Sequence, residues 1–188
     1  MQRVAHLELS EIAKDSSKEA LFSQLVRTQH GRALSTAYRM LRGERATAED
    51  VVQDAFLRAY RGLDKFRGES QLSTWFFTIL IREVRGHQRR SNLRNWLTLD
   101  RVLTPAKSPP EQDVGLQKRI TLALEALTER QRTAFVLIYL EEFSLSEAAE
   151  IMGCAPGSMK SHLSRARKHM RSSLKDIEGQ LKAKESKA

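Results

Sequence analysis

The 188-residue sequence has little of several features that define common classes of protein. It has a single cysteine, Cys154, and therefore cannot form an internal disulfide, which excludes a small secreted scaffold held by disulfides. No stretch approaches the roughly 20 apolar residues that a membrane-spanning helix needs. Residues 1–13 carry Glu8 and Glu11 and lack the apolar core of a signal peptide. We therefore expect a cytoplasmic protein that does not insert into a membrane.

Groups that would carry covalent or metal chemistry are also scarce. The five histidines, His6, His30, His87, His162 and His169, have no ligand-like spacing with the cysteine, so we predict no metal site. We also predict no cofactor and no enzymatic activity, and an enzyme with Cys154 as its nucleophile is the weakest functional alternative. Packing as a small apolar group is the simpler role for this thiol, because nothing adjacent supplies a second thiol for redox sensing.

Positive charge is abundant. The chain has 32 Lys and Arg against 23 Asp and Glu, a net charge of +9. Such a surplus favours an anionic partner, with nucleic acid as the first candidate, although an inert basic surface would look the same. The charge is uneven: it collects over residues 82–101 and 160–175, whereas Glu49, Asp50 and Asp54 form a local negative face.

Apolar residues recur at helical spacing in both halves of the chain, and no long stretch alternates with the period of a strand. The sequence therefore predicts an all-α protein with two small helical domains, residues 18–91 and 116–174. A linker at 92–115 contains Pro105, Pro109 and Pro110, and a polar tail at 175–188 is expected to fray beyond Gly179. In the first domain, Gly31 is a candidate interruption and Thr47 a candidate helix cap.

Residues 144–170 have the pattern of a helix-turn-helix. Ser144 or Ser146 can cap a short helix, Gly153 suits its left-handed end, and Pro156 suits the first turn of a second helix from about residue 157. Met159, Leu163, Ala166 and Met170 would face inward. The remaining residues would face the major groove or the phosphates of duplex DNA: Ser158, Lys160, Ser161, His162, Ser164, Arg165, Arg167 and Lys168. An ordinary helical hairpin with a solvated basic face is the alternative interpretation.

Residues 48–60 (AEDVVQDAFLRAY) form an acidic amphipathic helix. In a basic protein this face is unsuited to DNA and favours docking to another protein, although a solvated face with local charge pairs has the same composition. In the following segment, a glycine-containing loop at 68–73 follows Phe66 and leads into a helix that is aromatic at its start and basic at its end. Its aromatics Trp75, Phe76 and Phe77 either line a pocket for an unstacked base or fill the core.

Taken in order, DxxQDxFLRAY, FRGES…STW, a proline-bearing linker, LTERQRTAFVLIYLEEFS and SxxEAAxxMG…GSMKSHLSRARK resemble the extracytoplasmic-function (ECF) sigma factors of bacterial RNA polymerase. The resemblance covers about residues 18–174. It implies that the two domains are sigma domains 2 and 4, which direct promoter-specific transcription initiation. It also implies three partners: core RNA polymerase, through its clamp helices and flap; promoter DNA; and an anti-sigma factor.

The resemblance also assigns residues to these roles. Core polymerase would be bound by Glu49, Asp50, Gln53, Asp54 and Phe56. The −10 promoter element would be recognised and opened by Phe66, Arg67, Gly68, Glu69, Ser70, Trp75 and Arg82, and the −35 element would be read by the helix-turn-helix residues given above. Arg82 departs from the family, which commonly has asparagine seven residues after the tryptophan, so the −10 preference is expected to differ. The alternative function is a helix-turn-helix regulator whose first half is a sensor or dimerisation domain.

Overall fold

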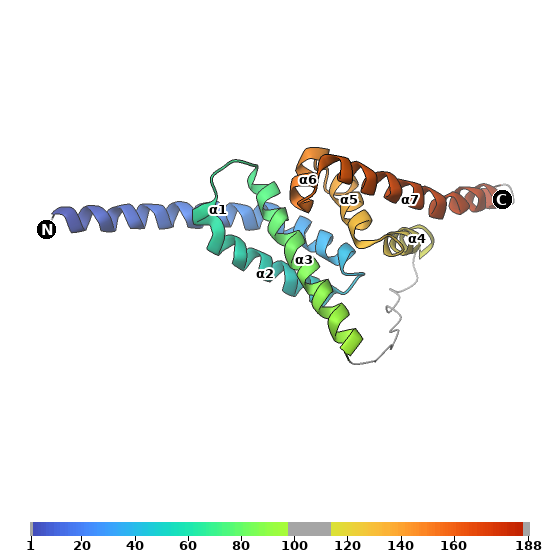
Figure 1. Ribbon diagram of the computed structural model, residues 1–188, viewed down its shortest axis with the longest axis horizontal. Coiled ribbons are helices and arrows are strands. Elements are labelled where there is room, and N and C mark those ends of the chain that lie inside the picture. The colour runs from blue at the N-terminus through green and yellow to red at the C-terminus, as the bar shows by residue number, and fades with distance from the viewer. Residues whose placement is uncertain (1, 98–113, 186–188) are drawn as a thin grey trace.

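The computed structural model describes residues 2–97 and 114–185, with side chains described over 17–94 and 119–174. All regular structure in these ranges is helical, as predicted. The first domain consists of α1 (Gln2–Met40), α2 (Arg45–Gly62), the short 3-10 helix η1 (Leu63–Lys65) and α3 (Leu72–Leu97). The second consists of α4 (Val114–Glu125), α5 (Glu129–Tyr139), α6 (Leu145–Met152) and α7 (Pro156–Glu185) (Figure 1).

In the first domain, α1, α2 and α3 pack against one another around aromatic and small side chains. Phe56 stacks on Phe76, with ring centroids 4.5 Å apart, and Phe76 and Phe77 are fully buried. The alanines at positions 33, 37, 48, 55 and 59 are fully buried on α1 and α2, where their small size permits close packing of helices.

Two local predictions for the first domain are wrong. Gly31 does not interrupt α1, which is continuous; buried Leu25 and Ala33 on either side of the glycine provide tertiary packing that outweighs its low helix propensity. Thr47 does not cap α2, because the helix already begins at Arg45 with Glu44 at the N-cap; the Thr47 hydroxyl instead donates to the Glu44 carboxylate at 3.1 Å.

In the second domain, side-chain caps define the helix boundaries. Thr128 and Gln131 form a reciprocal capping box at the start of α5, and Ser144 and Glu147 form one at the start of α6. Gly153 ends α6 in the left-handed conformation, with φ of 60°, and α7 begins at Pro156. These positions confirm the predicted helix-turn-helix and select Ser144 rather than Ser146 as the cap.

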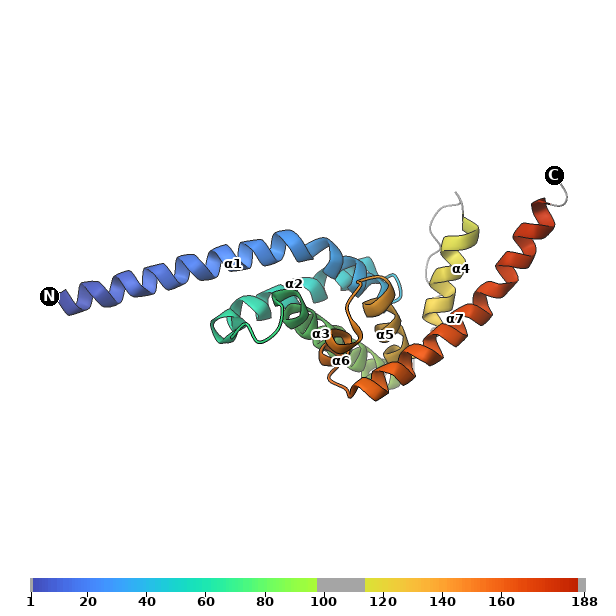
Figure 2. The same cartoon turned by 90° about the horizontal axis from the view of Figure 1, so that it is seen from above.

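The limits of the helices differ from the predicted domain boundaries. As Figures 1 and 2 show, α1 extends as a single rod well beyond α2 and α3, far upstream of residue 18. Helix α3 continues to Leu97, past the predicted start of the linker, and the linker prolines at 105, 109 and 110 lie outside the described residues. Helix α7 runs to Glu185, past Gly179, after which the sequence predicts fraying.

The two domains share one hydrophobic core. A single cluster of buried residues joins Phe76, Phe77 and Leu80 of the first domain to Leu137, Phe143 and Ile151 of the second. The rings of Phe77 and Phe143 meet edge to face with centroids 4.9 Å apart. Helix α6 packs on α3, and α5 packs on α1. The two domains therefore contact each other directly in addition to being joined by the linker.

Candidate nucleic-acid and protein interfaces

The acidic face of α2 is exposed as predicted. Glu49, Asp50, Gln53 and Asp54 all lie at the surface, because the opposite side of the helix is buried through Val51, Val52 and Ala55. Beside this face is an apolar groove of about 320 Å³ between α1 and α2, lined by Val26, His30, Leu34, Glu49, Val52, Gln53 and Phe56. An apolar groove with a carboxylate rim suits a protein partner that presents apolar and basic side chains.

Phe56, unlike the four exposed polar residues of α2, is buried. Its side chain is 7% exposed and packs with the rings of Phe76, Phe22 and His30. It therefore belongs mainly to the core and reaches a partner only as part of the groove lining. Sequence reasoning missed the α1 side of this groove, although the spacing of Val26, His30 and Leu34 at every fourth residue is the signal that could have revealed it.

The loop between η1 and α3 presents charged side chains around an aromatic pair. Arg67, Gly68 and Glu69 are exposed, Gly68 has φ of 71°, and Phe66 and Ser70 are half-buried. The ring centroids of Phe66 and Trp75 are 5.2 Å apart. The Trp75 ring also packs against Gly62 at the end of α2, where an added Cβ atom would lie 3.3 Å from the ring. Phe76 and Phe77 fill the core, which leaves Phe66 and Trp75 as the partly accessible aromatics of this loop.

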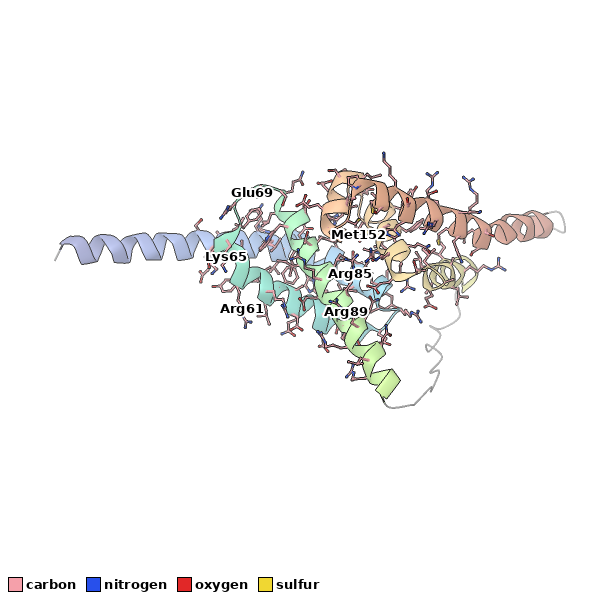
Figure 3. The ribbon with its side chains drawn as sticks, in the orientation of Figure 1. Arg61, Lys65, Glu69, Arg85, Arg89 and Met152 are labelled. Carbon is pink, nitrogen blue, oxygen red and sulfur yellow. The ribbon has the colours of Figure 1, made fainter. Side chains whose placement is uncertain are left out.

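Basic residues flank the same loop. Arg61 and Lys65, near the end of α2 and in η1, are exposed. In Figure 3, the label of Lys65 lies between those of Arg61 and Glu69 along this end of the first domain. Arg61 and Lys65 were missed in the sequence prediction, although their position just before the FRGES segment was available as a signal. On α3, Arg82 is exposed, whereas its neighbour Glu83 is buried and pairs with Arg58 at 2.9 Å.

Arg85 of α3 is engaged with the second domain. Its guanidinium donates to the backbone carbonyl of Met152 at 3.1 Å and lies 3.8 Å from a carboxylate oxygen of Glu129 (Figure 3). Burial lowers the pKa of Arg85 from its ordinary value, and the nearby Glu129 carboxylate partly offsets this effect. The basic end of α3 is therefore in contact with the second domain at Arg85, while Arg89 and Arg90 remain exposed.

The second helix of the helix-turn-helix exposes the predicted basic and polar residues. Met159, Ala166 and Met170 are buried and Leu163 is half-buried, which turns the remaining side chains outward. Exposed residues of the predicted DNA face are Ser158, Lys160, Ser161, Ser164, Arg165, Arg167 and Lys168. A shallow hollow of about 240 Å³ is lined by Ser164, Arg167, Lys168 and Arg171. Arg171, missed from the sequence, lies on this face because it follows Arg167 by one helical turn.

His162 differs from its neighbours because it is half-buried. Its pKa is lowered, chiefly by burial and further by the positive charges of Arg130, Arg165 and Arg85. Arg130 belongs to α5 and Arg85 to α3, so the start of α7 lies near α3 of the first domain.

Metal-binding clusters and membrane-spanning helices are lacking over the described part of the chain. Within that part, no group of three or more His, Cys, Asp or Glu residues is placed to hold a metal ion. Cys154 is a half-buried free thiol packed against the core. Among the described residues, no helix has the length and apolar character required to span a membrane.

Comparison with known proteins places both domains. The protein-family model of Sigma-70 region 2 matches residues 25–94, and the family model of Sigma-70 region 4 matches residues 117–170. The ECF RNA polymerase sigma factor EcfG of Rhodopseudomonas palustris is 35% identical over 140 residues, covering 74% of this chain and 77% of that protein.

Two solved structures resemble the fold across both domains. The sigma factor RpoE in complex with the anti-sigma factor NepR from Bartonella quintana has a TM-score of 0.72 and 32% identity, covering 82% of this chain and 96% of that one. CnrH in complex with the cytosolic domain of CnrY has a TM-score of 0.60 and 27% identity, covering 83% and 88%. The chain belongs to the ECF family of RNA polymerase sigma factors.

Proposed function

We propose that this sigma factor binds core RNA polymerase through the acidic face and groove of α2, and contacts the promoter through α3 and α7. The observation that carries the proposal is the segregation of charge. A chain of net charge +9 exposes three carboxylates on α2, beside an apolar groove, and places exposed arginines and lysines on α3 and α7. One surface suits a protein and the others suit nucleic acid.

At the −35 element, the first turns of α7 would enter the major groove. Lys160, Ser161 and Ser164 lie where side chains reach base edges, and a lysine suits the acceptor atoms of guanine. Arg167, Lys168 and Arg171 lie further along the helix, where they would neutralise phosphates without reading sequence.

At the −10 element, the loop at 66–71 and the start of α3 would hold the opened strand. The aromatic pair Phe66 and Trp75 offers a surface on which an unstacked base can stack, and Arg61, Lys65 and Arg67 surround it with positive charge. Arg82, in the position where the family commonly has asparagine, would contribute a phosphate contact in place of an amide contact. Opening then requires no covalent step, so the proposed function is non-enzymatic.

An anti-sigma factor is the further partner that we propose. Both solved relatives described above are complexes, RpoE with NepR and CnrH with the cytosolic domain of CnrY. The alternative of a regulator with an N-terminal sensor domain is not supported, because the first half of this chain matches Sigma-70 region 2.

In vitro transcription with core polymerase tests the proposal. The purified chain should direct promoter-dependent transcripts from a genomic template library, and the Asp54→Lys variant should lose this activity together with core binding. Glu19→Lys provides a matched control, because Glu19 is also exposed in the first domain but lies outside α2. If neither the parent chain nor the control yields a promoter-dependent transcript, the proposed function is wrong.

A further inference from the structure

A lysine of α1 contacts the segment that leads into the proposed −10 loop. Lys18 Nζ lies 2.5 Å from a carboxylate oxygen of Asp64, which belongs to η1, and 4.7 Å from the ring centroid of Tyr60, in the last turn of α2. The Lys18 side chain is only 19% exposed, so the ion pair and the aromatic ring replace much of the water around it. One side chain of α1 therefore holds both the end of α2 and the short helix that follows.

Aromatic side chains next to Lys18 make this contact part of a continuous seam between α1 and α2. Phe22 lies one helical turn after Lys18, and its ring meets that of Tyr60 edge to face with centroids 5.0 Å apart. The same Phe22 ring lies 6.3 Å from that of Phe56, one turn earlier on α2. Positions 56, 60 and 64 recur at every fourth residue, as positions 18 and 22 do, so the two rows run side by side in opposite directions.

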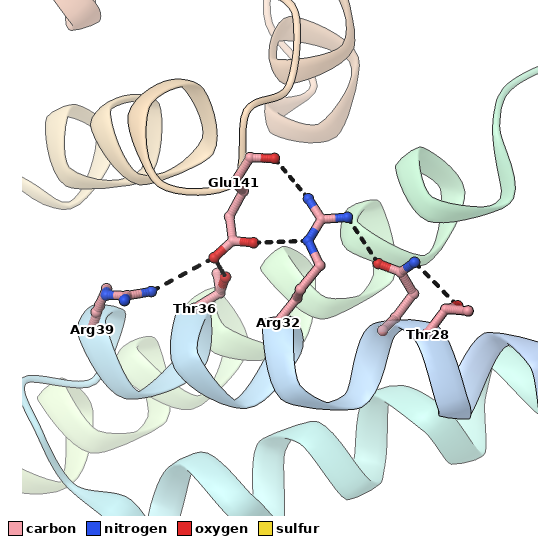
Figure 4. A network of polar contacts seen from close by, with 6 residues as sticks. Thr28, Arg32, Thr36, Arg39 and Glu141 are labelled. Atoms are coloured by element: carbon pink, nitrogen blue, oxygen red, sulfur yellow. Dashed lines mark hydrogen bonds and ion pairs between the residues drawn. The ribbon is translucent and has the colours of Figure 1, made fainter.

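The remainder of α1 provides a fixed platform for this contact. Leu25 is buried in the core of the first domain. Further along the helix, the Thr36 hydroxyl donates to Glu141 Oε1 of the second domain at 2.6 Å, and Arg32 Nε donates to Oε2 of the same carboxylate at 3.2 Å (Figure 4). Because α1 is one continuous helix, its contact at Lys18 fixes η1 relative to the core.

The position of η1 in turn determines where the proposed base-stacking pair lies. Phe66 follows Asp64 by two residues, and its amide donates to the carbonyl of Leu63 at 3.0 Å. Leu63 is buried, so the start of η1 is fixed from the core side as well. The ring centroids of Phe66 and Trp75 are 5.2 Å apart. A displacement of η1 would therefore change the spacing of these two rings.

Lys18 also balances a negative charge at this end of the domain. Arg61, Lys65 and Arg67 are exposed around the aromatic pair. Asp64 lies among them in the chain, with a side chain that is 65% exposed. An unpaired carboxylate at this position would repel the phosphates of a nucleic-acid strand. The Lys18 ammonium offsets that charge from the side of α1.

We propose that Lys18 is a positioning residue for promoter opening: paired with Asp64, it holds η1 so that Phe66 and Trp75 are spaced to receive an unstacked base. Lys18 lies upstream of residues 25–94, the segment that matches Sigma-70 region 2, so the working −10 surface depends on chain outside that segment. This inference rests on the proposed assignment of the −10 surface. Lys18 acts through η1 and requires no contact of its own with DNA.

Exchange of the two charges tests the proposal in the full chain. Lys18→Glu and Asp64→Lys each bring like charges together and should displace η1, whereas the double variant restores an ion pair in the opposite sense. Recovery in the double variant therefore separates loss of the pair from misfolding. Arg27→Glu is the matched control for Lys18→Glu, because Arg27 is exposed on the opposite side of α1 and its substitution changes net charge equally.

Tryptophan fluorescence of the free protein reports the position of the aromatic pair. The chain has two tryptophans, so in a Trp96→Phe background the acrylamide quenching constant follows the exposure of Trp75 alone. This constant should rise in both single variants, return towards the parent value in the double variant and stay unchanged in Arg27→Glu. Lys18→Arg should also keep the parent value, because arginine retains the charge and the aromatic contact. An unchanged constant in Lys18→Glu would overturn the proposal.

Transcription with core polymerase provides the functional measurement. On a promoter recovered from the genomic template library, both single variants should lose about three- to tenfold of the promoter-dependent transcript, and the double variant should regain it. Affinities for core polymerase and for −35 duplex should be unchanged, because a positioning role at η1 affects only the opened strand.

Asp64→Lys is the sharper of the two single changes, because it adds positive charge beside the proposed path of the strand. If Asp64 acted on DNA directly, this change would strengthen strand binding. More transcript from Asp64→Lys than from the parent chain would therefore overturn the proposal. Failure of the parent chain to direct any transcript would instead refute the proposed function, because the quenching measurement does not involve polymerase.

Discussion

Arg132 provides a stringent quantitative test of how the second domain is held together. Its side chain is 3% exposed and donates to four backbone carbonyls: Leu124 at 2.8 Å, Glu125 at 2.8 Å, Leu127 at 3.3 Å and, from the first domain, Met40 at 3.1 Å. The guanidinium thus satisfies the carboxyl-terminal carbonyls of α4 and also reaches the end of α1. Burial lowers the pKa of Arg132, which means that its buried charge is costly and is tolerated because these acceptors surround it.

The effect of Arg132→Met follows from counting the acceptors left without a partner. The Met40 carbonyl keeps a hydrogen bond from Gln88 at 3.0 Å, and the Leu124 carbonyl keeps one from the Leu127 amide at 3.2 Å. The carbonyls of Glu125 and Leu127 lose the bonds from the arginine, at about 1–3 kcal/mol for each buried group left unsatisfied. Removal of the buried charge offsets part of this cost, so we expect the free energy of unfolding to fall by about 2–4 kcal/mol in total.

Urea unfolding followed by circular dichroism measures this change in the free energy of unfolding. Arg130→Met is the matched control, because Arg130 is two residues away on the same helix but exposed, and its substitution should stay within about 0.5 kcal/mol of the parent. The expected loss is a large fraction of the 5–15 kcal/mol typical of a folded protein. Equal midpoints for the two variants would show that Arg132 does not stabilise the domain through these carbonyls.

Three further predictions concern the functional surfaces. Asp54→Lys should weaken core-polymerase binding while −35 duplex binding is retained, because Asp54 is exposed on α2, away from α7; titration against core enzyme and against duplex DNA compares the two affinities. Arg167→Ala should weaken binding to all duplex sequences and reduce the slope of log affinity against log salt by about 1, and an unaltered slope would contradict a phosphate contact. The lowered pKa of His162 means that the folded chain disfavours its protonated form, so this residue's contribution to stability should be retained above its unfolded-state pKa and lost as pH falls from that value through the lower folded-state pKa. NMR titration of the folded and urea-unfolded chains should therefore give the lower His162 pKa in the folded state, and the reverse order would contradict this account.

The helix-turn-helix was predictable because its signals are local. A capping serine, a glycine in the left-handed conformation and a proline in the first turn each act within a few residues, so Ser144, Gly153 and Pro156 could be identified from their neighbours alone. The outward set on α7 followed from helical periodicity once Met159, Ala166 and Met170 were assigned to the core. The family and its two domains were recognisable for the same reason, since its motifs are contiguous stretches of sequence.

Features that depend on competing interactions were less predictable. The cap at Thr47 and the break at Gly31 are locally reasonable, but packing of α1 against α2 outweighs these weak preferences. Phe56 was grouped with its acidic neighbours, yet its ring contacts with Phe76 place it mainly in the core. His30 and Leu34 complete a groove whose other wall is on a different helix, so neither helix by itself reveals it.

The sequence alone determined the helical class, the uneven charge and the location of the helix-turn-helix, because periodicity, caps and composition act over one or two turns. Only the tertiary structure decided that the two domains share a core and that Glu141 is buried against Arg32 and Thr36. Nothing near Glu141 in the sequence marks it as different from exposed Glu142, because its partners lie more than a hundred positions away on α1. Burial removes the water that would otherwise solvate this carboxylate, and the arginine and threonine of another helix take its place.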